Sequence, residues 1–203
     1  LKEAARDRKI YLYNSTAAIQ GFGTIGRSVA DYLAETGCVI VALSDPRGGI
    51  YNEEGINVKA AIEYKVEHGT LEGFPGAQRI TNDELLGLQV DFLVPAAMEY
   101  TINKKNAGSI KASIIAEAAN AGISREAHQI LEDRGAFVLP DILVNAGGIV
   151  VSYFEWVQDK QQFFWGPLEV EERFQNIMID SYRRLEAIMV EDKVTMRTAA
   201  LKL

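Results

Sequence analysis

The segment Gly21-Phe22-Gly23-Thr24-Ile25-Gly26 places three glycines in the order G-x-G-x-x-G. The apolar residues 16–20 (TAAIQ) come directly before it and are predicted to form a short buried strand. Residues 24–35 follow with apolar side chains at helical spacing. The glycines therefore lie at a predicted strand-to-helix turn.

Each glycine of this turn has a separate mechanical role. Gly21 permits the tight turn, Gly23 lets the backbone approach a pyrophosphate, and Gly26 lets the helix pack close to the strand. The free N–H groups and the dipole at the start of the helix attract phosphates. The pattern predicts a dinucleotide site, with a glycine-rich turn that binds nothing as the alternative. The intervening residues of the same loop are included in the predicted site: Phe22, Thr24 and Ile25.

An acidic residue stands where such a site needs one. Asp45 ends the second predicted strand, about 20 residues after the last glycine, the usual distance to the acid that binds the adenine ribose. A carboxylate there repels a 2′-phosphate and favours NAD over NADP. Arg47 lies two residues later, and its guanidinium can instead receive that phosphate. We expect NAD as the cofactor, and NADP stays open.

The rest of the chain alternates apolar strands with amphipathic helices, which is typical of a parallel α/β sheet. We predict a Rossmann-like, doubly wound, mostly parallel sheet followed by a C-terminal helical segment. Strands are expected at 16–20, 38–43, 90–94, 113–116 and 136–139, helices at 1–9, 24–35, 58–67, 103–110 and 124–134, and loops at 46–55 and 68–76. From Gly148 onward the pattern is entirely helical.

Composition narrows the function classes. The 203 residues carry a formal net charge of −7, which argues against a nucleic-acid partner because phosphate binding needs concentrated positive charge. No apolar run is long enough to span a membrane, and the single cysteine, Cys38, cannot form an intramolecular disulfide. His68 and His128 are 60 residues apart and have no Cys or carboxylate neighbours at metal-ligand spacing, so no metal site is expected. A cytoplasmic protein is the default expectation.

Several ordered blocks resemble the cofactor-binding domain of hexameric glutamate dehydrogenases, within the Glu/Leu/Phe/Val dehydrogenase superfamily. The resemblance runs from about residue 16 to residue 197, and the last block is similar to the glutamate branch. The blocks are Gln20–Gly26, Ser44–Asn52, Gly73–Ala77, Leu93–Ala97, Pro140–Gly148 and Val151–Gln158.

This resemblance implies further site residues. Pro95, Ala96 and Ala97 match the loop that passes the nicotinamide ribose. Asn120 and Asn145 match asparagines that hydrogen-bond the nicotinamide end of the cofactor, and Ser152 matches the serine that contacts the side-chain carboxylate of glutamate. The resemblance thus adds six residues to the predicted site: Pro95, Ala96, Ala97, Asn120, Asn145 and Ser152.

One block departs from the family pattern. Ala118 and Ala121 stand where the family has glycines that can take positive φ, and Ile123 replaces a hydroxyl-bearing residue. We therefore expect altered cofactor contacts through Asn120.

The family resemblance also implies a catalytic lysine and aspartate in a separate N-terminal substrate domain, and nothing in this sequence matches that region. We expect a dinucleotide-binding domain at 1–155, a helical segment at 156–203 packing on it, no N-terminal substrate domain, and no catalytic residue in this chain. The parent enzyme would be a homo-hexamer that oxidises L-glutamate to 2-oxoglutarate and ammonia. A non-catalytic cofactor-binding or assembly module, and a dehydrogenase for another amino acid, remain the alternatives.

Overall fold

The computed structural model describes all 203 residues, which form two compact units, Leu1–Val138 and Leu139–Leu203. The division falls within β7 (Phe137–Leu139), between Val138 and Leu139, whereas the predicted domain boundary lies after residue 155. The reason is packing: α6 (Asp141–Val144) and α7 (Ala146–Gln161) contact α8 (Pro167–Asp192). The helices after the last strand therefore form a unit with one another.

The first unit is built on a seven-stranded sheet of order β4-β3-β2-β1-β5-β6-β7. β1 pairs in parallel with β2 on one side and β5 on the other, and β5 pairs in parallel with β6. The strands are β1 (Thr16–Gln20), β2 (Val39–Asp45), β3 (Gly48–Tyr51), β4 (Gln78–Ile80), β5 (Phe92–Pro95), β6 (Ile114–Ala116) and β7 (Phe137–Leu139). The predicted mostly parallel α/β sheet is confirmed.

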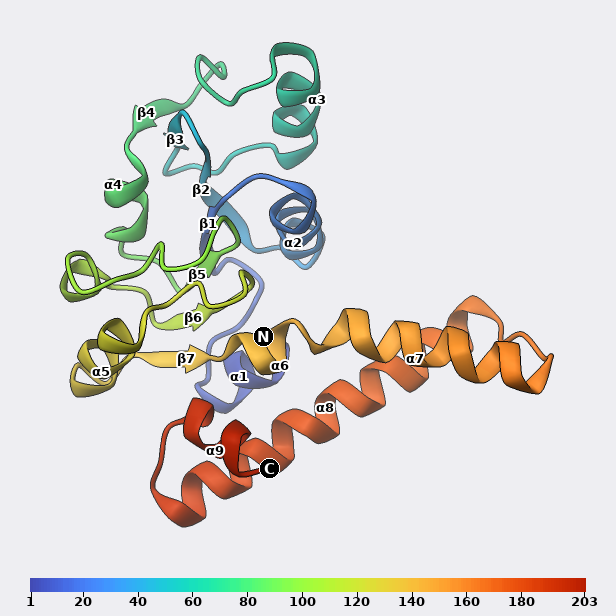
Figure 1. Cartoon of the computed structure of the whole chain (residues 1–203). Coiled ribbons are helices and arrows are strands. Elements are labelled where there is room, and N and C mark those ends of the chain that lie inside the picture. Colours follow the sequence, from blue (N-terminus) through green and yellow to red (C-terminus); the bar gives the residue numbers. More distant parts are fainter. The chain divides into compact units, whose positions relative to one another are not determined.

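Helices lie on both faces of this sheet (Figure 1). α2 (Thr24–Glu35) and α3 (Val58–His68) contact each other on one face, while α4 (Asn82–Leu86) and α5 (Arg125–Asp133) lie on the other. α1 (Lys2–Asp7) precedes β1. The central strands are covered on both sides, so their side chains are almost entirely buried: the burial patterns of β1, β2 and β5 contain no exposed residue.

The direction of chain progression reverses between β1 and β5. From β1 the chain moves outward to β2, β3 and β4, and then returns through α4 to β5 on the other side of β1. In open α/β sheets, ligands bind outside the carboxyl ends of the strands at such a switch point. The G-x-G-x-x-G loop follows β1 at this position.

Two local predictions were wrong, and one helix was not predicted. The expected loop at 46–55 contains β3, which pairs antiparallel with β2 and with β4. The expected helix at 103–110 is reduced to the 3-10 turn Ala107–Ser109, because the Asn103 and Asn106 side chains accept backbone N–H groups of Lys105 and Asn103 and so compete with helical bonds. The helix that was not predicted is α4, which begins with a capping box between Thr81 and Glu84.

The second unit is wholly helical. α8 begins with Pro167 in its first turn and runs to Asp192, and α9 (Met196–Lys202) packs against it. An ion pair of 3.0 Å between Arg197 Nη1 and Asp141 Oδ1 joins α9 to α6. No helix in either unit is long and apolar enough to cross a membrane.

Candidate dinucleotide site

The glycine loop has the geometry that its sequence predicts. Gly21 has a φ of 94°, a left-handed conformation, and a Cβ at this position would lie 2.6 Å from Ala97 Cα. A Cβ on Gly26 would lie 1.9 Å from the Gly21 carbonyl oxygen. Both glycines are therefore required by contacts within the protein itself.

Gly23 differs from these two glycines. It is exposed, has no positive φ, and a Cβ there would meet no atom within 4 Å. It is the N-cap of the 12-residue helix α2, and no side chain caps that helix. The first N–H groups of a helix have no intrahelical carbonyl partner, so an uncapped start beside open space suits an anion such as a pyrophosphate.

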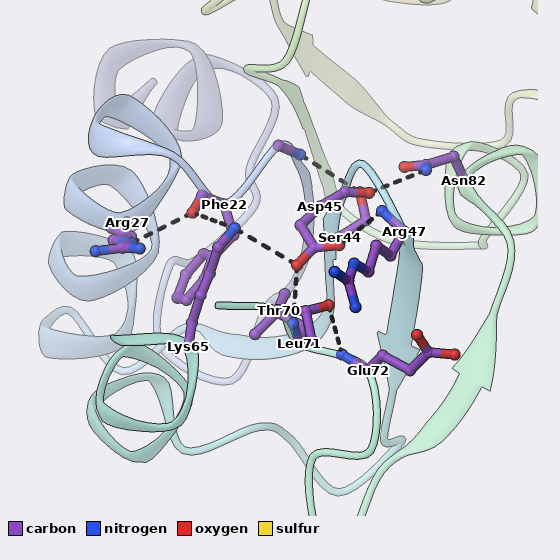
Figure 2. A network of polar contacts seen from close by, with 11 residues as sticks. Phe22, Arg27, Ser44, Asp45, Arg47, Lys65, Thr70, Leu71, Glu72 and Asn82 are labelled. Atoms are coloured by element: carbon purple, nitrogen blue, oxygen red, sulfur yellow. Dashed lines mark hydrogen bonds and ion pairs between the residues drawn. The ribbon is translucent and has the colours of Figure 1, made fainter. Parts of the chain in front are cut away.

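A network of polar contacts fixes the backbone of the glycine loop to β2, α2 and α3 (Figure 2). The Gly21 and Phe22 N–H groups donate to the Ser44 carbonyl oxygen at 3.1 and 2.7 Å, which fastens the loop to β2. The Phe22 carbonyl oxygen accepts hydrogen bonds from Lys65 Nζ at 3.0 Å and Arg27 Nε at 3.3 Å. The Phe22 ring is fully buried, so only its backbone is available to a ligand.

The carboxylate of Asp45 is engaged inside the protein. Its side chain is only 2% exposed, its Oδ1 accepts the Arg47 N–H at 2.9 Å, and its Oδ2 accepts the Leu71 N–H at 2.8 Å. Lys65 Nζ lies 3.6 Å from Oδ2. Burial raises the pKa of Asp45, but the N–H donors, Lys65 and Thr70 outweigh burial, so the pKa is lowered overall. Asp45 is thus ionised at neutral pH, yet presents little surface to a ribose.

Arg47 has the opposite character, since its side chain is exposed. With Arg79 and Asn82 it lines an open hollow of about 410 Å³ beyond the end of β2. Arg79 Nη1 is paired with Glu72 Oε1 at 2.8 Å, while no partner of the Arg47 side chain is found.

The loops after β5 and β6 lie at the same carboxyl end of the sheet as the glycine loop. Pro95 is buried at the end of β5, Ala96 is half-buried and Ala97 is exposed beside Gly21. The Ala96 N–H donates to the Gln20 carbonyl oxygen at 2.8 Å, which joins this loop to β1. Asn120 is exposed in the loop that follows β6.

The whole chain, residues 1–203, matches the family model described as Glutamate/Leucine/Phenylalanine/Valine dehydrogenase. The chain belongs to this family. The recognition made from the sequence blocks is therefore confirmed.

Curated relatives of the chain are named glutamate dehydrogenases. The chain is 49% identical over 187 residues to the glutamate dehydrogenase of Thermotoga maritima, covering 92% of this chain and 45% of that protein. It is 45% identical to the NADP-specific glutamate dehydrogenase of Synechocystis sp., covering 94% and 46%. It is 40% identical to the cryptic catabolic NAD-specific glutamate dehydrogenase GudB of Bacillus subtilis, covering 98% and 47%. The chain thus spans a little under half the length of these relatives.

A solved structure agrees with the sequence comparisons. The hetero-hexameric glutamate dehydrogenase of Thermus thermophilus, in its Leu-bound form, superposes with a TM-score of 0.92 at 32% identity, covering 98% of this chain and 47% of that one. The fold of this family member is therefore that of a known glutamate dehydrogenase region.

The structure brings together the predicted site residues of the first unit. The glycine loop, Asp45 and Pro95–Ala97 lie together at the carboxyl ends of the adjacent strands β1, β2 and β5. Asn120 lies in the loop next to Pro95–Ala97. Asn145 lies at the junction of α6 and α7 in the second unit, and Ser152 is exposed within α7.

Two residues of the network escaped sequence reasoning. Lys65 and Arg27 lie 39 and 1 residues beyond the G-x-G-x-x-G motif, and both donate to the Phe22 carbonyl oxygen. The only signal in the sequence was a lysine in the last turn of a helix, which is normally a solvated residue. Lys65 reaches the glycine loop only because α3 packs against α2.

Proposed function

We propose that this chain is the NAD(P)-binding part of a glutamate dehydrogenase. One observation supports it most: the open space at Gly23, in front of an uncapped helix, in a loop whose other two glycines are required by the protein's own contacts. A turn that bound nothing would not need a glycine at this position, since its φ is ordinary and its surroundings are empty.

Each end of the cofactor would meet different residues. The N–H groups of the loop from Gly21 to Gly26 would hold the pyrophosphate, with Phe22 contributing its backbone only. Asp45 and Arg47 would lie at the adenosine end. Pro95, Ala96, Ala97 and Asn120 would lie at the nicotinamide end, since an amide side chain can serve both a carboxamide and a ribose hydroxyl. Asn145, in the second unit, is assigned a nicotinamide contact by the family resemblance alone.

The relatives are named NADP-specific or NAD-specific enzymes, so the names leave the choice open. The geometry favours tolerance of NADP. The Asp45 charge is compensated by Lys65 and two N–H donors, which weakens its repulsion of a 2′-phosphate, while the exposed Arg47 guanidinium stands nearby. Calorimetric titration with NAD and NADP side by side tests this; NADP binding ten times weaker than NAD binding would contradict it.

In the whole protein, the bound dinucleotide would supply a hydride acceptor at C4 of its nicotinamide. L-Glutamate would lose a hydride from Cα and a proton from its amino group to give an imino acid, which water hydrolyses to 2-oxoglutarate and ammonia. Ser152 would contact the side-chain carboxylate of the substrate. We propose a homo-hexamer for the whole protein, from the resemblance to hexameric glutamate dehydrogenases.

The chain alone is proposed to bind the dinucleotide without turnover, because no residue here is assigned to proton transfer on the amino acid. Glutamate-dependent NAD(P) reduction by this polypeptide would contradict that statement. Turnover of leucine or phenylalanine, and not glutamate, by a longer chain that contains it would instead favour a dehydrogenase for another amino acid.

The Gly23→Ala variant tests dinucleotide binding directly. The added Cβ meets no protein atom, so the free energy of unfolding should change by less than about 1 kcal/mol, the range for an N-cap change. The same Cβ would occupy the space proposed for the pyrophosphate, so affinity for NAD should fall at least tenfold. Calorimetry and urea denaturation measure the two effects. Unchanged affinity in a stable variant, or no binding by the unmodified chain, would contradict the proposed function.

A further inference from the structure

A buried carboxylate stands at the end of β6 and has no part in the function proposed above. Glu117 directly follows β6 and its side chain is 0% exposed. Its Oε1 accepts the Ile123 N–H at 2.8 Å. The contact joins the two ends of the seven-residue segment 117–123, which contains Asn120, so Glu117 closes this loop from the inside.

Backbone hydrogen bonds join the same loop to the loop after β5. The Ala118 and Ala119 N–H groups donate to the Pro95 carbonyl oxygen at 3.1 and 2.8 Å. In return, the Tyr100 N–H donates to the Ala121 carbonyl oxygen at 2.8 Å, and the Ile102 N–H to that of Gly122 at 3.0 Å. The loops that carry Ala97 and Asn120 are therefore joined to each other by hydrogen bonds, and Ala97 packs against Gly21.

The carboxylate of Glu117 also lies near the helix that follows the loop. His128, on α5, places its Nε2 3.8 Å from Glu117 Oε2, and its side chain is 16% exposed. α5 begins at the N-cap Ser124, whose Oγ accepts the Ala127 N–H, immediately after the loop. Glu117 thus contacts the loop and lies beside the helix that ends it.

Burying a carboxylate costs several kcal/mol that its contacts only partly repay, so an apolar residue of similar size would stabilise the fold as well or better. Stability therefore does not explain why a carboxylate is buried here. The hydrogen bond that fixes the shape of the loop does explain it.

We propose that Glu117 is a positioning residue for the nicotinamide half of the bound dinucleotide. By accepting the Ile123 N–H, it holds the loop of Asn120 in the shape that docks against Pro95–Ala97. Its side chain is fully buried, so it would act through the loop and not by touching the ligand. The inference rests on the proposed function, because it assumes that the loops after β5 and β6 meet the nicotinamide end.

Two ligands that differ only at that end test the proposal. NAD and ADP-ribose share the adenosine, the pyrophosphate and the second ribose, and only NAD carries nicotinamide. Calorimetry measures the dissociation constants of both for the unmodified chain and for Glu117→Leu, which removes the acceptor. A hydrogen bond to a charged group contributes about 1.5–3 kcal/mol, so we expect NAD affinity to fall about tenfold or more while ADP-ribose affinity changes less than twofold.

Glu117→Gln serves as the conservative variant, because its side-chain oxygen can still accept the Ile123 N–H. It should recover most of the NAD affinity lost in Glu117→Leu. Glu132→Gln, at an exposed carboxylate of the same helix as His128, is the matched control and should leave both affinities unchanged. If Glu117→Leu fails to fold, Glu117→Asp replaces it; its side chain is one methylene shorter and places the acceptor too far from Ile123, so the same selective loss of NAD affinity is expected.

The possible failures are distinguishable. If the unmodified chain binds neither ligand, the proposed function fails. If it binds both, and removal of the acceptor weakens NAD and ADP-ribose equally or affects neither, Glu117 is only a structural residue and the inference is overturned while the proposed function stands.

Discussion

At the scale of single residues, the backbone at Ala121 is strained. Ala121 has a φ of 50°, in the left-handed region that costs a residue with a Cβ about 1–2 kcal/mol. Its carbonyl oxygen accepts the Tyr100 N–H, which fixes the residue in this conformation. The resembling family has a glycine at this position, and the positive φ of Ala121 gives the physical reason for it.

We therefore predict that Ala121→Gly stabilises the chain. Relief of the left-handed strain outweighs the greater entropy of glycine in the unfolded chain, which leaves a net gain of about 0.5–1 kcal/mol in the free energy of unfolding. Urea denaturation measures it. The control is Ala187→Gly, at an exposed position in the interior of α8, which should lose about 1 kcal/mol; a loss in both variants would show that Ala121 is not strained.

A second prediction at this scale concerns the acid stability that Asp45 contributes. Its pKa is about 3.8 in the unfolded chain and lower in the folded chain, so between these values the unfolded chain binds more protons. The contribution is fully present above the unfolded pKa and is lost as the pH falls through the folded pKa. Asp45→Asn should cost about 1–3 kcal/mol at pH 7, and the difference from the unmodified chain should shrink as the pH falls below 3.8.

Urea denaturation between pH 7 and pH 2.5 measures this difference. Glu53→Gln, at an exposed carboxylate, should show no comparable cost at any pH. A constant difference between Asp45→Asn and the unmodified chain over the whole range would refute the assignment of the lowered pKa.

At the scale of elements, α2 can start where it does only because two glycines let it approach β1. The Gly26 Cα faces the Gly21 carbonyl oxygen so closely that a methyl group must displace the helix or the loop. Backbone atoms supply the clash, so no side-chain rotation relieves it.

We expect Gly26→Ala to lose about 2–3 kcal/mol of unfolding free energy, in spite of the better helix propensity of alanine. The matched variant is Gly23→Ala, three residues earlier on the same turn, where the added methyl group meets open space. Denaturation curves of the two variants compare them; equal stabilities would mean that the close approach of α2 is not required by the fold.

The antiparallel strands show where element prediction fails. Gly48 and Gly49 suggest a loop, yet both lie in β3, which pairs with Asp45 and Ser44 of β2. A Cβ on Gly49 would lie 3.0 Å from Ile80 Cγ1, so the glycine permits close packing of β4 on β3. A local pattern cannot report this, because the partner strand begins 27 residues beyond the end of β3.

At the scale of the whole molecule, the proposed cofactor residues fall in both units. The glycine loop, Pro95–Ala97 and Asn120 belong to the first unit, and Asn145 belongs to the second. Ligand binding is therefore expected to leave a signature in each unit.

We predict that saturating NAD slows amide hydrogen exchange in segments 21–26 and 95–97 of the first unit and at residues 145–148 of the second. Ligand bound at 100 times its dissociation constant stabilises the binding-competent state by about 2.7 kcal/mol, which is enough to detect. Residues of α9 are the internal control and should not change. Slowing confined to the first unit would contradict the assignment of Asn145 and leave that of the glycine loop standing.

The sequence by itself determined the mostly parallel sheet and the glycine turn, because these depend on local patterns: glycine spacing, apolar runs and helical periodicity. The family was recognised from the resemblance of several ordered sequence blocks to its members. Tertiary structure decided what surrounds the turn. Lys65 and Leu71 approach Asp45 from distant positions and occupy its carboxylate, and Glu117 closes the loop of Asn120 through Ile123. Burial and long-range hydrogen bonds set these environments, and neither is encoded in the spacing of neighbouring residues.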